Sequence, residues 1–277
     1  MTDDRRRTMG RSKRSFDLRM MLWPLGKVQS WAAQQPVLGR FVHADVSPDH
    51  NRHIIIPVNR VVRGTENVVL PPVVLEALVA RASRHVTLDQ CLCRRAEHCH
   101  TYPRDIGCLF LGDAAGQIDD ELSRTLSPEE ALAHARQAME AGLTPMIVHA
   151  AYDADLLGID YNRMLAVCFC CDCCCTVRKS LRTGPHAFGD SVLRLPGLRV
   201  EVGPECTGCG ECLDLCHAAA ISLVDGRAVI GEACKGCGRC AAACPQSAID
   251  LYLDDSVNVM ERLFALVEER TTIEATV

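Results

Sequence analysis

The chain has few aromatic residues and no long apolar run, and both shortages narrow what it can be. Aromatic side chains make up 4% of the 277 residues, and the net charge of −5 gives no general basic surface for nucleic acid. No run approaches the ~18 apolar residues that a membrane-spanning helix needs. The arginines at Arg5–Arg7 are not followed closely by a continuous apolar stretch, as an export signal would require. These absences predict a cytoplasmic protein.

The motifs of common nucleotide-dependent and hydrolytic enzymes are missing as well. There is no P-loop, no Rossmann glycine pattern and no G-x-S-x-G. The glycines between residues 107 and 116 lack the strand–turn–helix context of a phosphate-binding loop. Nucleotide-binding and hydrolase functions therefore have no support.

Cysteine, in contrast, is abundant, with 18 residues in the chain. In a reducing compartment this content indicates metal ligation more than disulfides. Eight cysteines form two copies of the spacing C-x2-C-x2-C-x3-C, and Pro245 follows the second copy at once. Structural zinc usually takes two separated C-x-x-C pairs, so the repeated spacing favours iron–sulfur clusters. The eight residues are Cys206, Cys209, Cys212, Cys216, Cys234, Cys237, Cys240 and Cys244.

This repeat resembles the bacterial two-cluster ferredoxins, over residues 200 to about 253. The resemblance implies two [4Fe–4S] clusters in which each motif lends its fourth cysteine to the other cluster. The chain departs from the family at His217, where proline is usual. This histidine either only loosens a turn or places a titratable donor beside a cluster. By position, one cluster would be held by Cys206, Cys209, Cys212 and Cys244, and the other by Cys234, Cys237, Cys240 and Cys216.

The ten upstream cysteines fall into two sequence groups and are candidate metal ligands. Each group could hold its own [4Fe–4S] cluster, or the two could share one site and leave spare thiols for redox or sulfur chemistry. Zinc or a reversible disulfide is the alternative for both groups. Arg94 and Arg95 would stabilise thiolate charge beside the first group. The groups are Cys91, Cys93, Cys99 and Cys108, then Cys168, Cys170, Cys171, Cys173, Cys174 and Cys175.

The whole layout is similar to a set of poorly characterised anaerobe proteins. The similarity covers about residues 54–253 and is carried by Cys91-Leu92-Cys93-Arg94, by residues 108–112 and by the run at 168–175. It implies a multi-cluster iron–sulfur protein of anaerobic metabolism.

We expect an α+β protein in which a two-cluster ferredoxin fold follows a small cysteine-rich α/β domain. Within the cysteine-rich domain we expect strands near 53–58, 146–148 and 164–169 and a helix at 71–84. We also expect a helix from Ser127 to Gly142 that opens with a capping box. A hairpin is expected at 221–230. The expected divisions are an N-terminal arm 1–50, the cysteine-rich domain 51–180, a glycine- and proline-rich linker 181–197, the ferredoxin domain 198–255 and a C-terminal helix and tail 256–277.

The N-terminal arm is basic, whereas the rest of the chain is acidic. Residues 1–20 hold seven basic and three acidic residues. Apolar residues at helical spacing in 16–25 predict a helix that either packs on the domain or lies at a membrane surface. We therefore expect the arm to dock a partner protein or the inner face of a membrane.

Three functions fit these features. The first is an electron-transfer protein that relays low-potential electrons to or from a partner redox enzyme, without a catalytic site of its own. The second is a reductase or reductive activator, with an upstream cysteine site fed by the ferredoxin domain. The third is a redox or metal sensor that uses the run at 168–175, although no DNA-binding element accompanies it.

Overall fold

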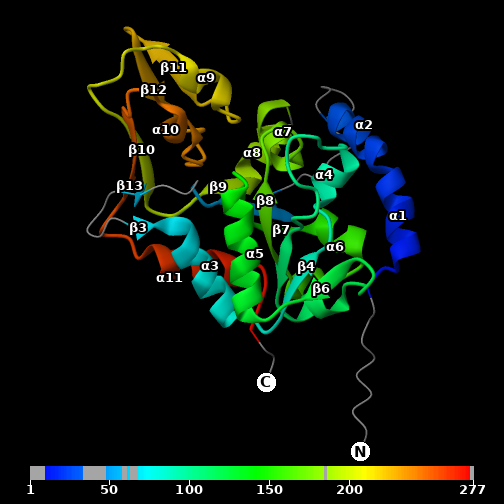
Figure 1. Cartoon of the computed structure of the whole chain (residues 1–277). Helices are drawn as coiled ribbons and strands as arrows, with labels where there is room; N and C mark the ends of the chain where they lie inside the picture. The colour runs from blue at the N-terminus through cyan, green and yellow to red at the C-terminus, as the bar shows by residue number, and fades with distance from the viewer. Residues whose placement is uncertain (1–9, 34–47, 58–60, 63–67, 184–185, 275–277) are drawn as a thin grey trace, which may run out of the picture.

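A seven-stranded sheet organises the larger part of the protein, which is mixed α/β (Figure 1). The computed structural model describes residues 10–33, 48–57, 61–62, 68–183 and 186–274. All neighbouring strands of the sheet are antiparallel except β1 and β9, which are parallel. In spatial order the strands are β6 (Ser123–Thr125), β4 (His85–Leu88), β5 (Leu109–Leu111), β8 (Leu165–Cys170), β7 (Thr144–Ala150), β1 (Asn51–Ile55) and β9 (Val192–Arg194).

The central strands carry the core. Every residue of β7 is buried, as expected for a strand covered on both faces. Along β8, Phe169 packs edge-on against the ring of His134 from α5 (Pro128–Glu140). Because side chains alternate between the faces of a strand, Cys168 and Cys170 lie on the other face of β8 from Phe169. The cysteine-bearing face of the sheet is thus set by the register of one strand.

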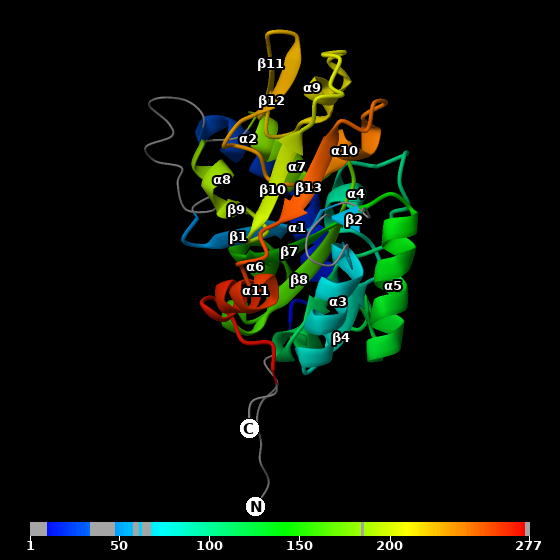
Figure 2. The same ribbon diagram turned by 90° about the vertical axis from the view of Figure 1, so that its left-hand side faces the viewer.

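Helices complete the layers around this sheet. Figures 1 and 2 both place α3 (Leu70–Arg81) beside α5, and α5 contacts β4, β7 and β8. The remaining elements outside residues 198–253 are α1 (Lys13–Met21), α2 (Trp23–Ala33), β2 (Val61–Val62), β3 (Val68–Val69), α4 (Leu92–Ala96), η2 (Asp113–Gln117), α6 (Ala151–Leu157), η3 (Tyr161–Arg163), α7 (Thr176–Thr183), α8 (His186–Ser191) and α11 (Val259–Glu268).

Several local predictions are confirmed. The Ser127 hydroxyl accepts a hydrogen bond from the Glu130 N–H at 3.2 Å, and the Glu130 carboxylate accepts one from the Ser127 N–H at 2.7 Å, which is the expected capping box. The expected strands near 53–58, 146–148 and 164–169 correspond to β1, β7 and β8, although residues 58–60 lie outside the described part. The helix expected at 71–84 is α3, and the helix expected within the C-terminal segment 256–277 is α11.

The segment 181–197 differs from the expected linker. Its described residues include the end of α7, then α8 and β9, and β9 pairs with β1 as an edge strand of the sheet. The glycines and prolines suggested irregular backbone, but Val192 and Phe188 are buried and tie the segment to the core. The cysteine-rich stretch 91–108 also contains regular structure, the short helix α4.

The C-terminal module is built from two copies of one unit. Strands β10 (Leu198–Val202) and β13 (Ile249–Leu253) pair antiparallel, and so do β11 (Ile221–Val224) and β12 (Arg227–Ile230), the expected hairpin. The short helices α9 (Glu211–Leu215) and α10 (Arg239–Ala243) contact each other. Val202 opposite Ile249 repeats Ile230 opposite Ile221. Figure 2 shows the two strand pairs and two helices above the sheet.

The N-terminal helices pack on the cysteine-rich part. Phe16 and Met20 are buried, whereas Leu18, Leu22 and Leu25 on the other side are more than half exposed. Asp17 pairs with Arg95 at 2.6 Å, so α1 is fixed next to α4. One face of the predicted amphipathic helix thus packs on the domain and the other stays open to solvent. No helix in the described part of the chain has both the length and the hydropathy to cross a bilayer.

A buried histidine makes stability depend on pH. Burial is the main reason why the pKa of His53 falls to about 4, and the charge of His149 lowers it further against a hydrogen bond with Ser191. The His53 imidazole therefore binds a proton below about pH 6.5 in the unfolded chain, but only below about pH 4 in the folded chain. We expect the free energy of unfolding of the wild type to fall across this window. Between pH 7 and pH 5, the free energy of unfolding of His53→Gln should fall by about 2 kcal/mol less than that of the wild type. Denaturant unfolding at both pH values tests this, and identical pH slopes would contradict it.

Candidate metal centres

A hollow in the C-terminal module brings together four cysteines from both copies of the motif. It is open to solvent and is lined by Cys206, Cys209, Cys212 and Cys244. Leu223 and Ile249 contribute an apolar wall. Cys244 is 32 residues or more from the other three, so only the folded module creates this group.

The other four cysteines of the repeat approach one another in the equivalent place. Burial raises the pKa of Cys240 to about 12, helped by the neighbouring thiols of Cys237 and Cys234 and, more weakly, by Cys216. Cys216 also raises the pKa of Cys234, after burial and Cys237. The structure therefore places Cys216 with the second motif and Cys244 with the first.

Backbone N–H groups point at the sulfur atoms in both halves. The Ala220 N–H donates to Cys216 Sγ at 3.3 Å, and the equivalent Ala248 N–H donates to Cys244 Sγ at 3.4 Å. Hydrogen bonds from Ala228 and Gly208 lower the pKa of Cys206. Such donors stabilise thiolates, the form in which cysteine binds metal. This donor set fits a group held by four thiolates in each half.

Left-handed backbone at glycine allows each motif to curl around its hollow. Gly208 and Gly236 have φ of +69° and +68°. Gly210 and Gly238, at +83° and +75°, precede α9 and α10. This conformation is strained for L-residues that carry a Cβ, but not for glycine. The sequence folds into two equivalent loops because the glycines recur with the cysteines.

His217 follows Cys216 in the position where the resembled family has proline. Burial, and then the positive charge of Arg178, lower the pKa of its imidazole to about 4. At neutral pH this side chain is therefore uncharged. This disfavours the alternative in which His217 changes its charge beside the thiols near pH 7. His98 and His100, near Cys99, are exposed.

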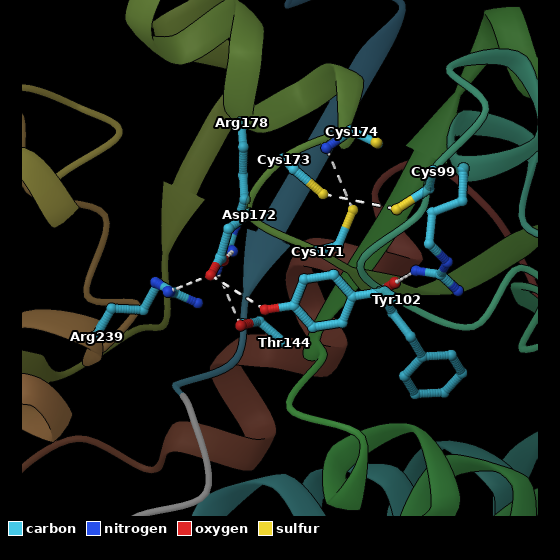
Figure 3. Close-up of polar contacts among 11 residues, drawn as sticks. Cys99, Tyr102, Thr144, Cys171, Asp172, Cys173, Cys174, Arg178 and Arg239 are labelled. Atoms are coloured by element: carbon cyan, nitrogen blue, oxygen red, sulfur yellow. Dashed lines mark hydrogen bonds and ion pairs between the residues drawn. The ribbon is translucent and has the colours of Figure 1, made fainter.

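Upstream, Cys99, Cys171, Cys173 and Cys174 form the tightest thiol cluster among the described residues. All four sulfur atoms lie within 4.8 Å of one another, and Cys99 Sγ is 3.6 Å from Cys173 Sγ (Figure 3). Cys171, Cys173 and Cys174 lie on the turn between β8 and α7, and Cys99 lies on the loop after α4. We call this group the upstream quartet.

The other upstream cysteines lie in two smaller groups. Cys91 interacts with Cys93 and Cys108, and a hydrogen bond with Cys168, together with burial, raises the pKa of Cys108. Cys170 and Cys175 form a separate pair in which the hydrogen bond from Cys170 lowers the pKa of Cys175 to about 7. The spatial groups therefore mix the two sequence groups: Cys99 joins the later run, and Cys168 joins the earlier loop.

Asp172 connects the upstream quartet to the C-terminal module. Its carboxylate pairs with Arg178 from α7 and with Arg239 from α10, and accepts a hydrogen bond from the Tyr102 hydroxyl at 3.3 Å (Figure 3). The side chain of Arg178 is 2% exposed. This junction could not be predicted from the sequence, because nothing in the spacing of Asp172 and Arg239 indicates that they meet.

Comparison with known proteins supports the metal assignment. Residues 212–253 match the LdpA Fe-S cluster-binding domain family, a stretch that includes Cys212, Cys216, Cys234, Cys237, Cys240 and Cys244. No curated protein and no solved structure is detectably similar to the chain. The matched family and the cysteine clusters together support an iron–sulfur domain and an iron–sulfur cofactor.

Proposed function

We propose that the chain is an iron–sulfur electron-transfer protein whose C-terminal module holds two [4Fe–4S] clusters. The observation that carries the proposal is the hollow where Cys206, Cys209 and Cys212 meet Cys244 from the other motif. The approach of Cys216 to Cys234 and Cys240 supports the reciprocal set. Bound there, such clusters would take up and release single electrons at low potential.

A cubane cluster suits the module better than a single zinc ion does. Tetrahedral zinc with Zn–S bonds of about 2.3 Å draws its four sulfur atoms to within about 4 Å of one another. The first set instead lines an open hollow, and among the described residues only the upstream quartet has its sulfur atoms drawn together within 4.8 Å. The first set also receives backbone N–H donors, which are groups that tune cluster potentials.

The module has one open end and one end that faces the rest of the chain. Cys209 in the first set is exposed. In the second set, Cys240 is buried and follows Arg239, which pairs with Asp172 of the upstream part. Electrons would enter or leave at the exposed set through a docked redox partner, and the second set would pass them toward the upstream cysteines. A relay of this kind needs no substrate pocket.

A reductive titration tests the function. Anaerobically prepared wild type should take up about one electron per cluster of the module from dithionite and return it to an oxidised acceptor dye. The double variant Cys206→Ala/Cys234→Ala removes one thiol from each set and should lose the electrons of the module. The matched control Cys170→Ser/Cys175→Ser lies outside the module and should retain them. Equal electron uptake by both variants would contradict the proposal.

The open face of the N-terminal helices is a second place for a partner. Leu18, Leu22 and Leu25 are exposed there beside the basic residues Lys13 and Arg14. We propose that a redox partner with an acidic rim docks at this face. Leu22→Glu should weaken partner binding without a loss of iron, as measured by pull-down from the native host and by metal analysis.

A further inference from the structure

The upstream quartet has the dimensions of a site for one metal ion. Its four sulfur atoms lie within 4.8 Å of one another, and Cys99 Sγ is 3.6 Å from Cys173 Sγ. A single tetrahedral ion with metal–sulfur bonds of about 2.3 Å draws four thiolates to within about 4 Å of one another. A four-iron cluster holds its cysteine sulfur atoms farther apart, because a cube of iron and sulfide lies between them. The spacing of the quartet therefore fits one ion and is too tight for a cluster.

The turn after β8 supplies three of these thiols in a pattern typical of tetrahedral sites. Cys171 and Cys174 form a C-x-x-C pair, a spacing that places two ligands on one ion. The Cys174 N–H donates to Cys171 Sγ at 3.3 Å, and such a donor stabilises the thiolate form that binds metal. Cys173 lies between them and adds a third thiol. One short turn thus gathers three of the four ligands.

Cys99 completes the set from a separate loop, which contacts the turn through groups other than thiols. It lies 74 residues before Cys173 in the chain. The backbone N–H groups of Thr101 and Tyr102 hydrogen-bond to the Cys99 sulfur atom. The Tyr102 hydroxyl in turn donates to the carboxylate of Asp172, in the middle of the turn, at 3.3 Å (Figure 3). Loop and turn are therefore joined independently of their thiols, which preorganises the four ligands.

We propose that Cys99, Cys171, Cys173 and Cys174 hold one zinc ion. Thiolates select zinc among single divalent ions, and four thiolates at tetrahedral spacing are the donor set of structural zinc sites. Four protein ligands leave no open position for a substrate, so the site is structural and not catalytic. A disulfide would use only two of the thiols and would not explain why four converge.

The zinc ion would strengthen the junction with the C-terminal module. It fastens the loop after α4 to the turn that carries Asp172, whose carboxylate pairs with Arg239 of α10. Zinc has no redox chemistry, so a relay that continues upstream from the second cysteine set would use thiols outside the quartet. The zinc site does not depend on the function proposed above.

X-ray absorption at the zinc edge tests the inference on the wild-type chain. The full-length chain is produced with both iron and zinc in the medium, purified without oxygen, and analysed for zinc, iron and acid-labile sulfide. We expect about one zinc atom per chain, with four sulfur neighbours at about 2.3 Å. A chain without zinc, or zinc surrounded mainly by nitrogen and oxygen, would overturn the inference. One iron atom in excess of the sulfide, in place of zinc, would overturn it as well.

Cysteine variants test which thiols bind the ion. Cys173→Ser changes an exposed side chain and should reduce the sulfur neighbours of zinc from four to three. Cys99→Ser/Cys174→Ser should lose the zinc. The matched control Cys170→Ser/Cys175→Ser changes the two thiols next to the turn in sequence and should retain it. Zinc with four sulfur neighbours in both quartet variants would overturn the inference.

Sulfide content separates this inference from the function proposed above. The zinc site contains no sulfide, so the quartet double variant should keep the sulfide of the wild type, and circular dichroism should show that it folds. Zinc bound to four sulfur atoms in a chain without sulfide would support the inference and refute the clusters of the module. Sulfide in a chain without zinc would overturn the inference and leave the clusters in place.

Discussion

Gly208→Ala is expected to abolish the first cluster site of the C-terminal module. Gly208 has a φ of +69°, and a Cβ there would lie 2.1 Å from the carbonyl oxygen of Gly226 in the turn of the β11–β12 hairpin. The position of the Cβ is fixed by the backbone and the oxygen is itself a backbone atom, so no side-chain rotation relieves the overlap. The hairpin must move away, and with it Ala228, whose N–H donates to Cys206 Sγ. We expect a loss of about four iron atoms per chain, measured by metal analysis.

Gly210→Ala is the matched control for that prediction. Gly210 also has a left-handed backbone, with a φ of +83°, but a Cβ there would meet only Leu213 Cδ1, at 3.7 Å. The substitution should cost about 1–2 kcal/mol of backbone strain and leave the iron content unchanged. If Gly208→Ala retains as much iron as Gly210→Ala, the hairpin is not what closes the first site.

Asp172→Asn is expected to have the largest effect on stability of any single charge removal at this junction. The substitution leaves Arg178, which is 2% exposed, without its carboxylate and removes the pairing with Arg239. Removal of one partner of a buried ion pair costs about 3 kcal/mol or more, because the other charge stays buried. The thermal midpoint of the full chain should therefore fall by roughly 6–12 °C.

Asp155→Asn gives the comparison at an exposed site. Asp155 also pairs with two arginines, Arg11 and Arg19, but its side chain is 61% exposed. Solvent screens these pairs, so the variant should lose less than about 1 kcal/mol of its free energy of unfolding. Its thermal midpoint should fall by under about 4 °C. Equal shifts for the two variants would show that Asp172 does not hold a buried charge network together.

Much of the fold was accessible from local sequence. The capping box at Ser127 and Glu130 fixed the start of α5, because both of its hydrogen bonds depend only on residues three apart. The apolar runs around Ile54, Ile147 and Val167 indicated strands, and all three are buried in the sheet. The Asp225-Gly226 turn predicted the β11–β12 hairpin. Each of these features is decided within a few residues.

The partition of the upstream cysteines was not accessible in the same way. The spacing suggested that Cys99 belongs with Cys91, Cys93 and Cys108, whereas the structure places it with the turn that follows β8. That placement depends on the antiparallel pairing of β5 with β8, which brings the loop before β5 beside the turn after β8. Asp172 and Arg239 also meet only through tertiary packing, which no local pattern encodes.

The direct test of the whole account is the iron and acid-labile sulfide content of the anaerobically purified full-length chain. Two clusters in the C-terminal module predict about eight acid-labile sulfide ions per chain and at least about eight iron atoms. A colourless chain that carries zinc and no sulfide would contradict it.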